Sequence, residues 1–453
     1  MDLELLPRAR CTEILETARK EAAAHGVTDV EVTVVAGSEA LTRFANNGIH
    51  QNVDERSRHV SIRCMQDRRT ARAATNRMDA DSIRRAVSDS ISILRVQQPE
   101  EQLPALLEPQ ATVDREVHRW TESVARCSPA ARATLVREAI DLARQSGLTA
   151  AGILSTSETV EALLSSTGLF CYHPQTMATF SITAMDDDSS GWAKESSTDL
   201  AALDVRALAR RAVEKAVRSR HPQELPPGAY TVILEPAAVL DLAGQMFPDF
   251  SGTSMEDQHS FLTGRLGEKL FGENISITDD VFHPLQAGPA FDGEGMPRQR
   301  LTLVDKGVAV EVVWSRIAAA RNSKRPTGHG LPLPNEAGEL PLNLVIAGGD
   351  STVEKMIAST TRGILVTRLW YIREVEPFAK LMTGMTRDGT FLIQGGEVTT
   401  GVRNFRFNQG IVDMLGKVEA LGEPVRASGE ETFDMVCPAM KVSEFNFSEV
   451  TKF

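Results

Sequence analysis

Apolar and polar residues alternate in two rhythms along this chain, and the rhythm changes near residue 222. Before that point, apolar residues three or four apart, the spacing of an amphipathic helix, lead into stretches where every second residue is apolar, the spacing of a half-buried strand. After it, short apolar runs bounded by glycine and aspartate predominate, as in strand-rich folds. The pattern predicts an α+β fold built from two different domains.

The first half contains the same pattern twice, in residues 8–95 and residues 129–220. Each copy begins with an amphipathic helix that ends at a glycine, continues with strands joined by a tight turn, and closes with a second helix. The turns are expected at residues 46–49 and 166–169, with Gly48 and Gly168 supplying the positive φ. Because two units are too few for a solenoid, we expect them to pair in one α+β domain.

A proline-rich stretch at residues 221–228 marks the domain boundary, because three prolines and a glycine break the preceding helix. We therefore expect an N-terminal domain over residues 1–221 and a strand-rich α+β domain over residues 228–453. In the second domain the pattern predicts helices at 237–246, 260–271, 351–359 and 410–421. It predicts strands at 230–234, 275–278, 301–304, 308–314, 343–347, 363–370, 390–394 and 405–407.

Charge and composition narrow the class of protein. Lys and Arg number 49 against 61 Asp and Glu, a net charge of −12 that repels nucleic-acid backbones, so no nucleic-acid partner is expected. The chain has no basic and apolar leader and no apolar run of about 18 residues, so we expect a cytoplasmic protein without membrane attachment. The five cysteines are widely scattered, and we expect them to be reduced and buried.

No zinc motif of the His-Glu-x-x-His or His-Glu-x-x-x-His type occurs, although a catalytic zinc needs three protein ligands. Two histidines follow a carboxylate by three residues, the spacing of a helical turn: His259 after Glu256 and His283 after Asp280. Glu256 is better explained at the start of the helix expected at 260–271, where a carboxylate favours the helix dipole. Ser351 with Glu354 is similarly expected to form a capping box rather than an anion site.

Residues 42–52 resemble the N-terminal signature of the TldD/PmbA family of peptidase-complex proteins. Further segments that resemble this family follow in its order and together cover essentially the full chain: residues 260–267, 277–280, 327–330, 363–367, 395–397 and 438–442. The resemblance implies a two-domain TldD/PmbA-like fold.

The zinc site of the family's catalytic branch is not recognisable here. That branch carries a His-Glu-x-x-x-His helix early in its second domain and a cysteine near the C-terminus. The comparable stretch, residues 236–247, holds no histidine, and Cys437 directly precedes a proline instead of standing several residues before it. The resemblance therefore implies a non-catalytic TldE/PmbA-like subunit with no cofactor of its own, and zinc on a TldD-like partner. Cys437 itself is expected to be a buried strand thiol.

What the resemblance implies for function is a metallopeptidase complex, a homo- or heterodimer, that hydrolyses peptide or amide bonds of unfolded or modified peptides. Peptide or partner contact is expected from polar signature residues on the predicted hairpin and from one histidine in the glycine-rich loop 325–330, unless these residues serve turn conformation alone: Arg43, Asn46, Asn47, His50, Gln51, Asn52 and His329. Two alternatives stay open. One is an autonomous amide hydrolase in natural-product or peptide maturation, and the other is a purely structural or regulatory binding protein.

Overall fold

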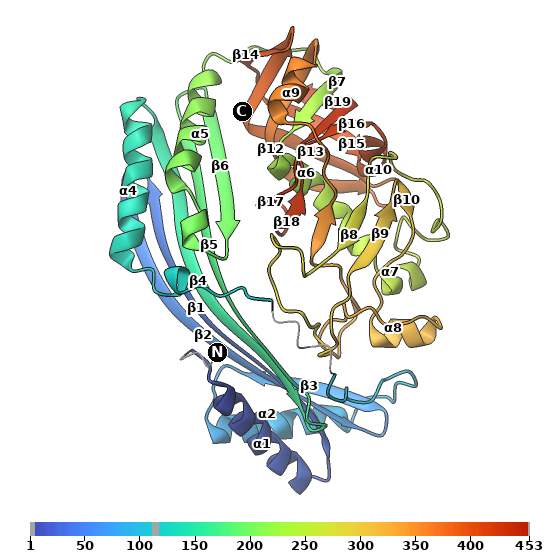
Figure 1. The fold of residues 1–453 in the computed structure, drawn as a ribbon. Coiled ribbons are helices and arrows are strands. Elements are labelled where there is room, and N and C mark those ends of the chain that lie inside the picture. The colour runs from blue at the N-terminus through green and yellow to red at the C-terminus, as the bar shows by residue number, and fades with distance from the viewer. Residues whose placement is uncertain (1–4, 111–116, 452–453) are drawn as a thin grey trace.

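A long curved sheet lies beside a compact strand-rich body in the computed structural model, which describes residues 5–110 and 117–451 (Figure 1). The sheet belongs to the first half of the chain and the body to the second half. The α+β architecture expected from the sequence is thereby confirmed.

The first sheet has six antiparallel strands in the order β3-β2-β1-β4-β5-β6. Each of the two sequence copies contributes three of them. Their bounds are β1 (Asp29–Ala45), β2 (Gly48–Gln66), β3 (Arg69–Thr75), β4 (Thr149–Ser165), β5 (Phe170–Met185) and β6 (Ser190–Ser197). The copies join where β1 pairs with β4, from Glu31 opposite Ser165 to Phe44 opposite Gly152. One continuous sheet therefore unites the two helix–strand–helix units, in agreement with the prediction that they pair.

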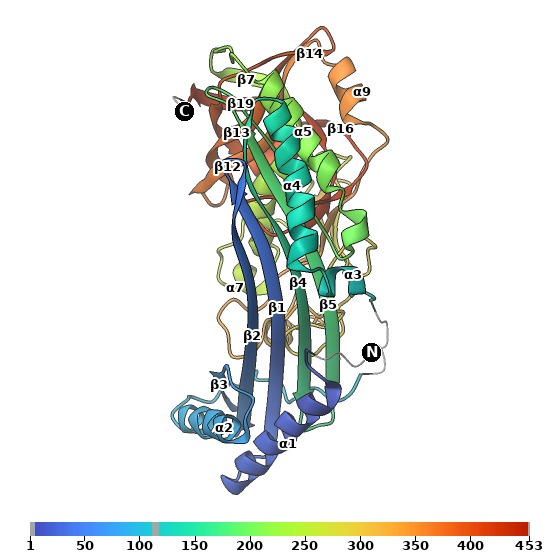
Figure 2. The same ribbon diagram turned by 90° about the vertical axis from the view of Figure 1, so that its left-hand side faces the viewer.

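Two separate hydrophobic cores sit at opposite ends of this sheet (Figure 2). Helices α1 (Arg8–Ala24) and α2 (Ala80–Leu94) cover one end, and α4 (Pro129–Gln145) and α5 (Val205–Arg218) cover the other. Short helices α3 (Glu122–Ala125) and η2 (Leu200–Ala202) lie in the connections. The strands are longer than either helix pair, so the stretch of β2 between the cores, residues 54–59, is exposed.

The first hairpin turn differs from the expectation that Gly48 supplies the positive φ. Asn46 (φ 50°) and Asn47 (φ 57°) hold it instead, and Gly48 is the first residue of β2. Positive φ at both central residues is the geometry of the tight hairpin turns that match strand twist, and asparagine tolerates it. In the second hairpin Gly168 does take positive φ, at 97°.

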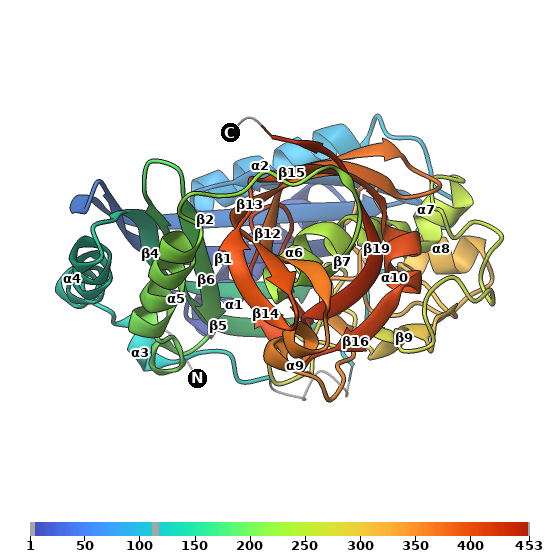
Figure 3. The ribbon, with the colours of Figure 1, turned by 90° about the horizontal axis from the view of Figure 1, so that it is seen from above.

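The second half folds around a small barrel, seen from above in Figure 3. It closes through β12, β7, β19, β15 and β13 because β12 and β13 also pair with each other, and β14 and β16 extend it. The bounds are β7 (Gly228–Leu234), β12 (Arg362–Glu376), β13 (Leu381–Gln394), β14 (Glu397–Gly401), β15 (Phe405–Gly410), β16 (Val418–Leu421) and β19 (Met440–Val450).

A third sheet packs beside the barrel in the order β10-β9-β8-β11-β18-β17. Its strands are β8 (Ile277–Asp279), β9 (Leu301–Asp305), β10 (Val308–Ala309), β11 (Leu344–Ile346), β17 (Val425–Ala427) and β18 (Met435–Cys437). The helices of this half are α6 (Pro236–Ala243), η3 (Gly244–Asp249), α7 (Gly252–Glu256), α8 (Arg316–Arg321), α9 (Val353–Ala358) and α10 (Ile411–Gly416). All of them except α9 pack in the largest hydrophobic core with both sheets, and α9 packs in a smaller cluster with β7, β12 and β13.

Several predicted elements of this half are wrong in extent or kind. Residues 260–271 form successive turns rather than a helix, because Gly264 (φ 75°) and Gly267 (φ 88°) leave the helical region. Glu256 therefore ends α7 instead of preceding a helix. The helix expected at 410–421 stops at Gly416 and continues as β16, and the strand expected at 308–314 keeps only two residues. Thr352, not Ser351, caps α9 by accepting from Lys355 N.

Candidate functional site

The two halves enclose a cavity of about 630 Å³ between β6, β17 and the start of α6. Within the described part of the chain, β6 pairs only with β5 and β17 only with β18, so each strand has one unpaired edge. The lining is Trp192–Thr198, Ala202, Arg211, Lys215, Glu235–Ala237, Pro284–Gln286 and Glu423–Ser428. Free strand edges offer backbone donors and acceptors to an extended chain.

Charged side chains of both signs line this cavity, and most of them contact a neighbour. Lys215 Nζ lies 2.5 Å from Glu235 Oε2, and Arg211 Nη1 lies 3.1 Å from Glu195 Oε1. Lys194 Nζ donates to the carbonyl oxygen of Gly429 at 2.6 Å. The wall is therefore polar and close to charge balance.

A buried polar cluster closes the cavity where β6 approaches β17. Ser196 Oγ donates to Asp434 Oδ2 at 2.5 Å and lies 2.8 Å from Ser428 Oγ. Arg426 donates to Ser196 Oγ through Nε at 3.0 Å and to Asp434 Oδ2 through Nη2 at 3.1 Å. Burial lowers the pKa of Arg426, and Asp434 opposes this shift. The Ser196 hydroxyl thus links β6 to β17 and to Asp434.

The stretch expected to hold a zinc helix forms α6 and η3, and one carboxylate there is buried. Asp241 Oδ1 accepts from the backbone N–H groups of Glu430 (3.1 Å) and Glu431 (3.2 Å). Burial raises the pKa of Asp241 to about 6, against the effect of these hydrogen bonds. Asp241 therefore joins α6 to the loop formed by residues 428–432, which we call the 428–432 loop.

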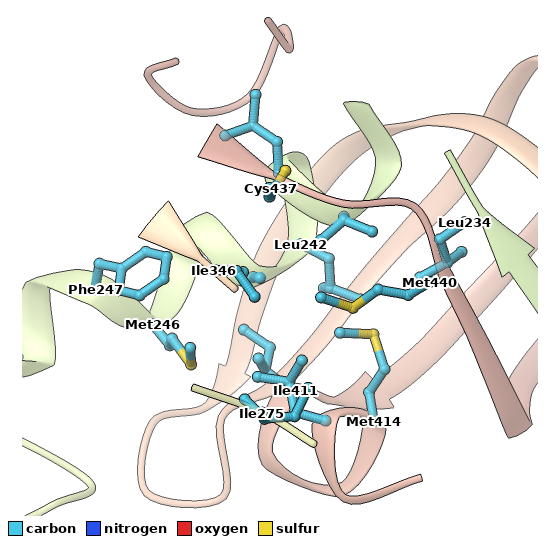
Figure 4. Close-up of a cluster of buried hydrophobic side chains, with 14 of the residues drawn as sticks. Leu234, Leu242, Met246, Phe247, Ile275, Ile346, Ile411, Met414, Cys437 and Met440 are labelled. Atoms are coloured by element: carbon cyan, nitrogen blue, oxygen red, sulfur yellow. The ribbon is translucent and has the colours of Figure 1, made fainter. Parts of the chain in front are cut away.

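Cys437 lies against the start of α6, at the border of the hydrophobic cluster in Figure 4. Its thiol is buried in β18 and donates to the carbonyl oxygen of Pro236 at 3.4 Å. Burial, and then the nearby Asp241, raise the pKa of this thiol well above its usual value. The thiol is thus protonated in the chain as it stands, and its contact is with a backbone carbonyl.

The residues at α6 and β18 do not fit a catalytic zinc ion. One carboxylate that binds backbone N–H groups and one thiol that donates to a carbonyl stand there, whereas a catalytic zinc site needs three ligands plus an open position. Across residues 5–110 and 117–451, no three His, Cys, Asp or Glu side chains are grouped so that they could hold a metal ion.

The two histidine–carboxylate pairs from the sequence are occupied by ordinary contacts. Glu256 Oε2 accepts from Asn322 Nδ2 at 3.4 Å. His283 Nδ1 accepts from Leu285 N at 3.2 Å, while Asp280 Oδ1 accepts from Phe282 N at 3.0 Å. Neither pair gains a third ligand.

The signature hairpin places its polar residues near the end of the sheet that α4 covers. β1 lies between β2 and β4 and has no free edge, whereas residues 48–59 of β2 have no strand on their outer side among the described residues. Arg43 donates to Gln51 Oε1 at 3.3 Å, and Asn52 Oδ1 accepts from Thr42 Oγ1. Arg43, Asn46, His50, Gln51 and Asn52 are exposed. The hairpin is thus open to a partner or an extended peptide only along β2.

Asn47 has a structural task in the same turn. Its Nδ2 donates to Leu148 O at 2.9 Å, and its Oδ1 accepts from Ala150 N at 2.8 Å. These bonds fix the turn of the first copy to the first strand of the second copy.

His329, the other predicted contact residue, is fully buried. Its Nε2 lies 3.0 Å from Asp279 Oδ1, and its Nδ1 lies 2.9 Å from Thr327 Oγ1. Burial of Asp279 opposes its ionisation, but His329 and neighbouring donors hold the pKa of Asp279 below its usual value. In this conformation His329 presents no surface to a peptide or partner.

A second contact between the two halves lies at the other end of the sheet, and we call it the β2 contact. Glu31 lies 2.6 Å from Arg72 Nη2 and 3.3 Å from Arg63 Nη1, and all three side chains belong to β1–β3. Arg72 Nε also donates to Leu333 O at 2.6 Å across the boundary. Two buried atoms here have no hydrogen-bond partner, Arg63 Nη2 and Glu294 Oε2.

Glu294 is a buried acid of the β2 contact. Its side chain is 1% exposed and lies 3.7 Å from Arg316 Nη1. Burial and the neighbouring Asp292 raise the pKa of Glu294 to about 7, against the effect of Arg316 and Arg63. The contact of β6 with the 428–432 loop, at the opposite end of the sheet, is called the β6 contact below.

The residues of the β6 contact were not recognised in the sequence. Asp241, Lys194 and Ser196 are separated from their partners in the 428–434 region by about 190 to 240 positions. No local spacing signals such pairs. Only the absence of histidine from residues 236–247 pointed to this place.

Comparison with known proteins agrees with the fold. Profiles of the PmbA/TldA metallopeptidase family match residues 30–94 (domain 1), 122–220 (central domain) and 227–449 (C-terminal domain). The first two matches correspond to the two copies of the N-terminal sheet. Among the described residues, no helix is long and apolar enough to cross a membrane.

Several relatives carry the name metalloprotease. One from Methanothermobacter thermautotrophicus is 24% identical over 303 residues, 61% of this chain and 64% of that protein. The metalloprotease TldD homolog of Buchnera aphidicola is 25% identical over 230 residues, 49% of this chain and 44% of that protein. The chain thus spans less than two thirds of the length of either relative.

The fold is that of TldE from Thermococcus kodakarensis, with a TM-score of 0.86 over 97% of this chain and 100% of that chain at 22% identity. Because the three family profiles follow one another across most of its length, the chain belongs to the PmbA/TldD family of metallopeptidase proteins.

Proposed function

We propose that this chain is a non-catalytic, TldE/PmbA-like subunit of a zinc metallopeptidase that hydrolyses peptide or amide bonds in unfolded or modified peptides. Zinc and catalysis reside on a TldD-like partner chain. The observation that carries the proposal is the state of α6: where the family's catalytic helix is expected there is no histidine, Asp241 binds two backbone N–H groups, and the Cys437 thiol donates to the Pro236 carbonyl.

The cavity between the halves supplies the binding role of this subunit. An extended peptide fits the unpaired edge of β6, because backbone groups on a strand edge recognise a chain without regard to its sequence. The paired charges of the wall leave main-chain hydrogen bonds as the main source of affinity. Recognition through the main chain suits a peptide that is unfolded, because its backbone groups are free to pair with the strand edge.

The hairpin residues are assigned to partner or peptide contact by the same reasoning. The exposed residues Arg43, His50, Gln51 and Asn52 border the open edge of β2, while Asn47 maintains the turn. A dimer with the TldD-like chain, in the cytoplasm, completes the proposal. No nucleic-acid role is included, since the net charge is −12.

The test is metal analysis and peptidase assay of the purified chain, alone and co-expressed with a TldD-type chain from the same source. We expect the isolated chain to contain less than a tenth of an equivalent of zinc and to leave an unfolded peptide intact. The co-purified complex should contain about one zinc per pair and cleave the peptide. A complex in which the zinc-binding histidines of the partner are replaced by alanine is the matched control, and it should keep both chains but lose zinc and cleavage.

Other outcomes favour the two alternatives. About one equivalent of zinc with amide hydrolysis in the isolated chain would establish an autonomous hydrolase, and Glu256, His259 and His283 would then be replaced first. A stable chain that recruits no TldD-type partner and no activity would leave a structural or regulatory binding protein.

A further inference from the structure

The 428–432 loop lies between three elements that are far apart in the sequence. Toward α6, Thr432 Oγ1 donates to Leu240 O at 3.2 Å. Toward β6, the Gly429 carbonyl accepts from Lys194. Toward β12, the Glu431 carboxylate accepts from Tyr371 N at 2.8 Å and from Ile372 N at 3.3 Å. The loop therefore connects the N-terminal sheet to both parts of the second half.

Asp241 provides the innermost of these attachments. Its side chain is fully buried, and one oxygen, Oδ1, receives the N–H groups of both Glu430 and Glu431. The other oxygen, Oδ2, has no hydrogen-bond partner. Burying a charged or polar group costs free energy unless hydrogen bonds compensate for the lost water, and the two loop N–H groups supply those hydrogen bonds to Asp241.

The approach of the loop to this carboxylate depends on a glycine. A Cβ at Gly429 would lie 2.2 Å from Asp241 Oδ1 and 2.9 Å from Leu240 Cδ2, so any larger residue displaces the loop. Gly429 has an ordinary backbone conformation, since its φ is not in the left-handed region. The glycine is thus required for close packing on Asp241 and not for a turn.

We propose that Asp241 is a positioning residue that fixes the 428–432 loop against α6, and that the loop so fixed keeps Ser428 and Lys194 in the cavity wall and holds β6 against the second half. The contacts toward β6 and β12 are made by residues adjacent to the two N–H groups that Asp241 binds. Loss of the Asp241 acceptor therefore releases all three sides of the loop together. This role is independent of the proposed zinc-bearing partner.

Amide hydrogen exchange of the full chain tests the assignment. In Asp241→Ala, exchange at residues 428–432 should accelerate at least tenfold, while exchange in the barrel strand β13 stays unchanged. In Asp241→Asn, Oδ1 is retained as an acceptor and exchange should stay within about threefold of the unmodified chain. Equal exchange in all three proteins would overturn the proposal, as would an equal acceleration in the loop and in β13.

The rate of chemical labelling of Lys194 gives a second measurement, which reports release of the loop at one side chain. The Lys194 side chain is 19% exposed while it donates to Gly429 O, so release of the loop should raise its rate of acylation relative to the exposed Lys20. Gly429→Ala should raise both loop exchange and Lys194 labelling even if Asp241→Ala does not fold. Gly416→Ala is the matched control, because a Cβ there meets no atom within 4 Å. Unchanged labelling in Gly429→Ala would contradict the proposed role.

Discussion

The β2 contact and the β6 contact join the same two halves of the molecule by opposite means. At the β2 contact, charges of both signs are buried together, and Arg63 Nη2 and Glu294 Oε2 have no hydrogen-bond partner. At the β6 contact, the Lys194 ammonium group lies beside a cavity and binds a backbone carbonyl as well as the partly exposed Glu430. Burial multiplies the effect of removing one charge, whereas solvent nearby reduces it. We infer that the β2 contact sets stability and that the β6 contact shapes the binding cavity.

The largest effect is expected from Glu31→Gln. Glu31 is 3% exposed and is the carboxylate shared by Arg63 and Arg72, so its loss leaves one buried and one partly buried guanidinium group without this counter-ion. Breaking a buried pair in this way costs roughly 3–5 kcal/mol. Chemical denaturation should show this loss, while Glu39→Gln, on an exposed part of the same strand, should change stability by less than about 0.5 kcal/mol. Similar midpoints for the two variants would refute the assignment of stability to the β2 contact.

A pH-dependent effect is expected from Glu294→Gln. The folded-state pKa of Glu294 is about 7 and its reference value is 4.5, so the folded protein binds more protons than the unfolded chain between these values. The contribution of Glu294 to the free energy of unfolding is therefore fully present below about pH 4.5 and is lost as the pH rises to about 7.

Glu294→Gln removes this dependence, so the stability of the variant relative to the unmodified chain should rise between pH 5 and pH 8, by at most about 3 kcal/mol. Melting midpoints of both proteins across this range provide the measurement. The groups that face Glu294 are Asp292, Arg316 and Arg63. A difference that is flat with pH would mean that Glu294 is ionised throughout.

A smaller effect is expected from Lys194→Met at the β6 contact. The substitution keeps much of the side-chain length but removes the hydrogen bond to Gly429 O and the ion pair with Glu430, at a cost of about 1–2 kcal/mol. Binding of an unfolded peptide to the cavity should weaken more than stability does. Isothermal titration with and without the substitution, together with a melting curve, separates the two. A loss of stability as large as that of Glu31→Gln would erase the proposed difference between the contacts.

The smallest effect on stability is expected from the exposed hairpin residues. Arg43→Ala and His50→Ala should each change the unfolding free energy by less than about 0.5 kcal/mol, because both side chains are exposed. Co-purification with a TldD-type chain and peptide binding are the informative readouts, and at least one should decrease. Asn47→Ala is a useful contrast, since it removes the bonds to Leu148 and Ala150 and should destabilise the turn. If Arg43→Ala and His50→Ala both leave partner and peptide binding intact, the hairpin serves conformation alone.

The fold of the N-terminal half was readable from the sequence because its signals are local and repeated. Two copies with the same helix, turn and strand spacing specify how each unit folds, and their similarity suggests that they pair. The expected helix at 260–271 failed because periodic apolar residues outweighed Gly264 and Gly267, whose positive φ ends any helix. The turn at residues 46–48 was predicted in the right place, but its positive φ angles lie on two asparagines rather than on the glycine.

The candidate site was only half readable. A missing histidine motif is visible in one stretch of sequence, but its replacement is not, because Asp241 and its partners Glu430 and Glu431 are about 190 residues apart. His329 looked accessible within a polar, glycine-rich loop, yet it pairs with Asp279 in the interior. Exposure is set by tertiary packing, which the local composition of a loop does not reveal.

The position of β7 in the barrel has a consequence for how the protein is made. β7 is the first strand of the second half, and it pairs in parallel with β12 and antiparallel with β19, the last strand. The ring cannot close until the ribosome has synthesised residues 440–450, more than 200 positions after β7. During that interval an apolar strand waits with an open side, whereas the N-terminal sheet is already complete. Nascent chains stalled after residue 220 should therefore be folded and soluble, and chains stalled near residue 400 should be the ones that need a chaperone.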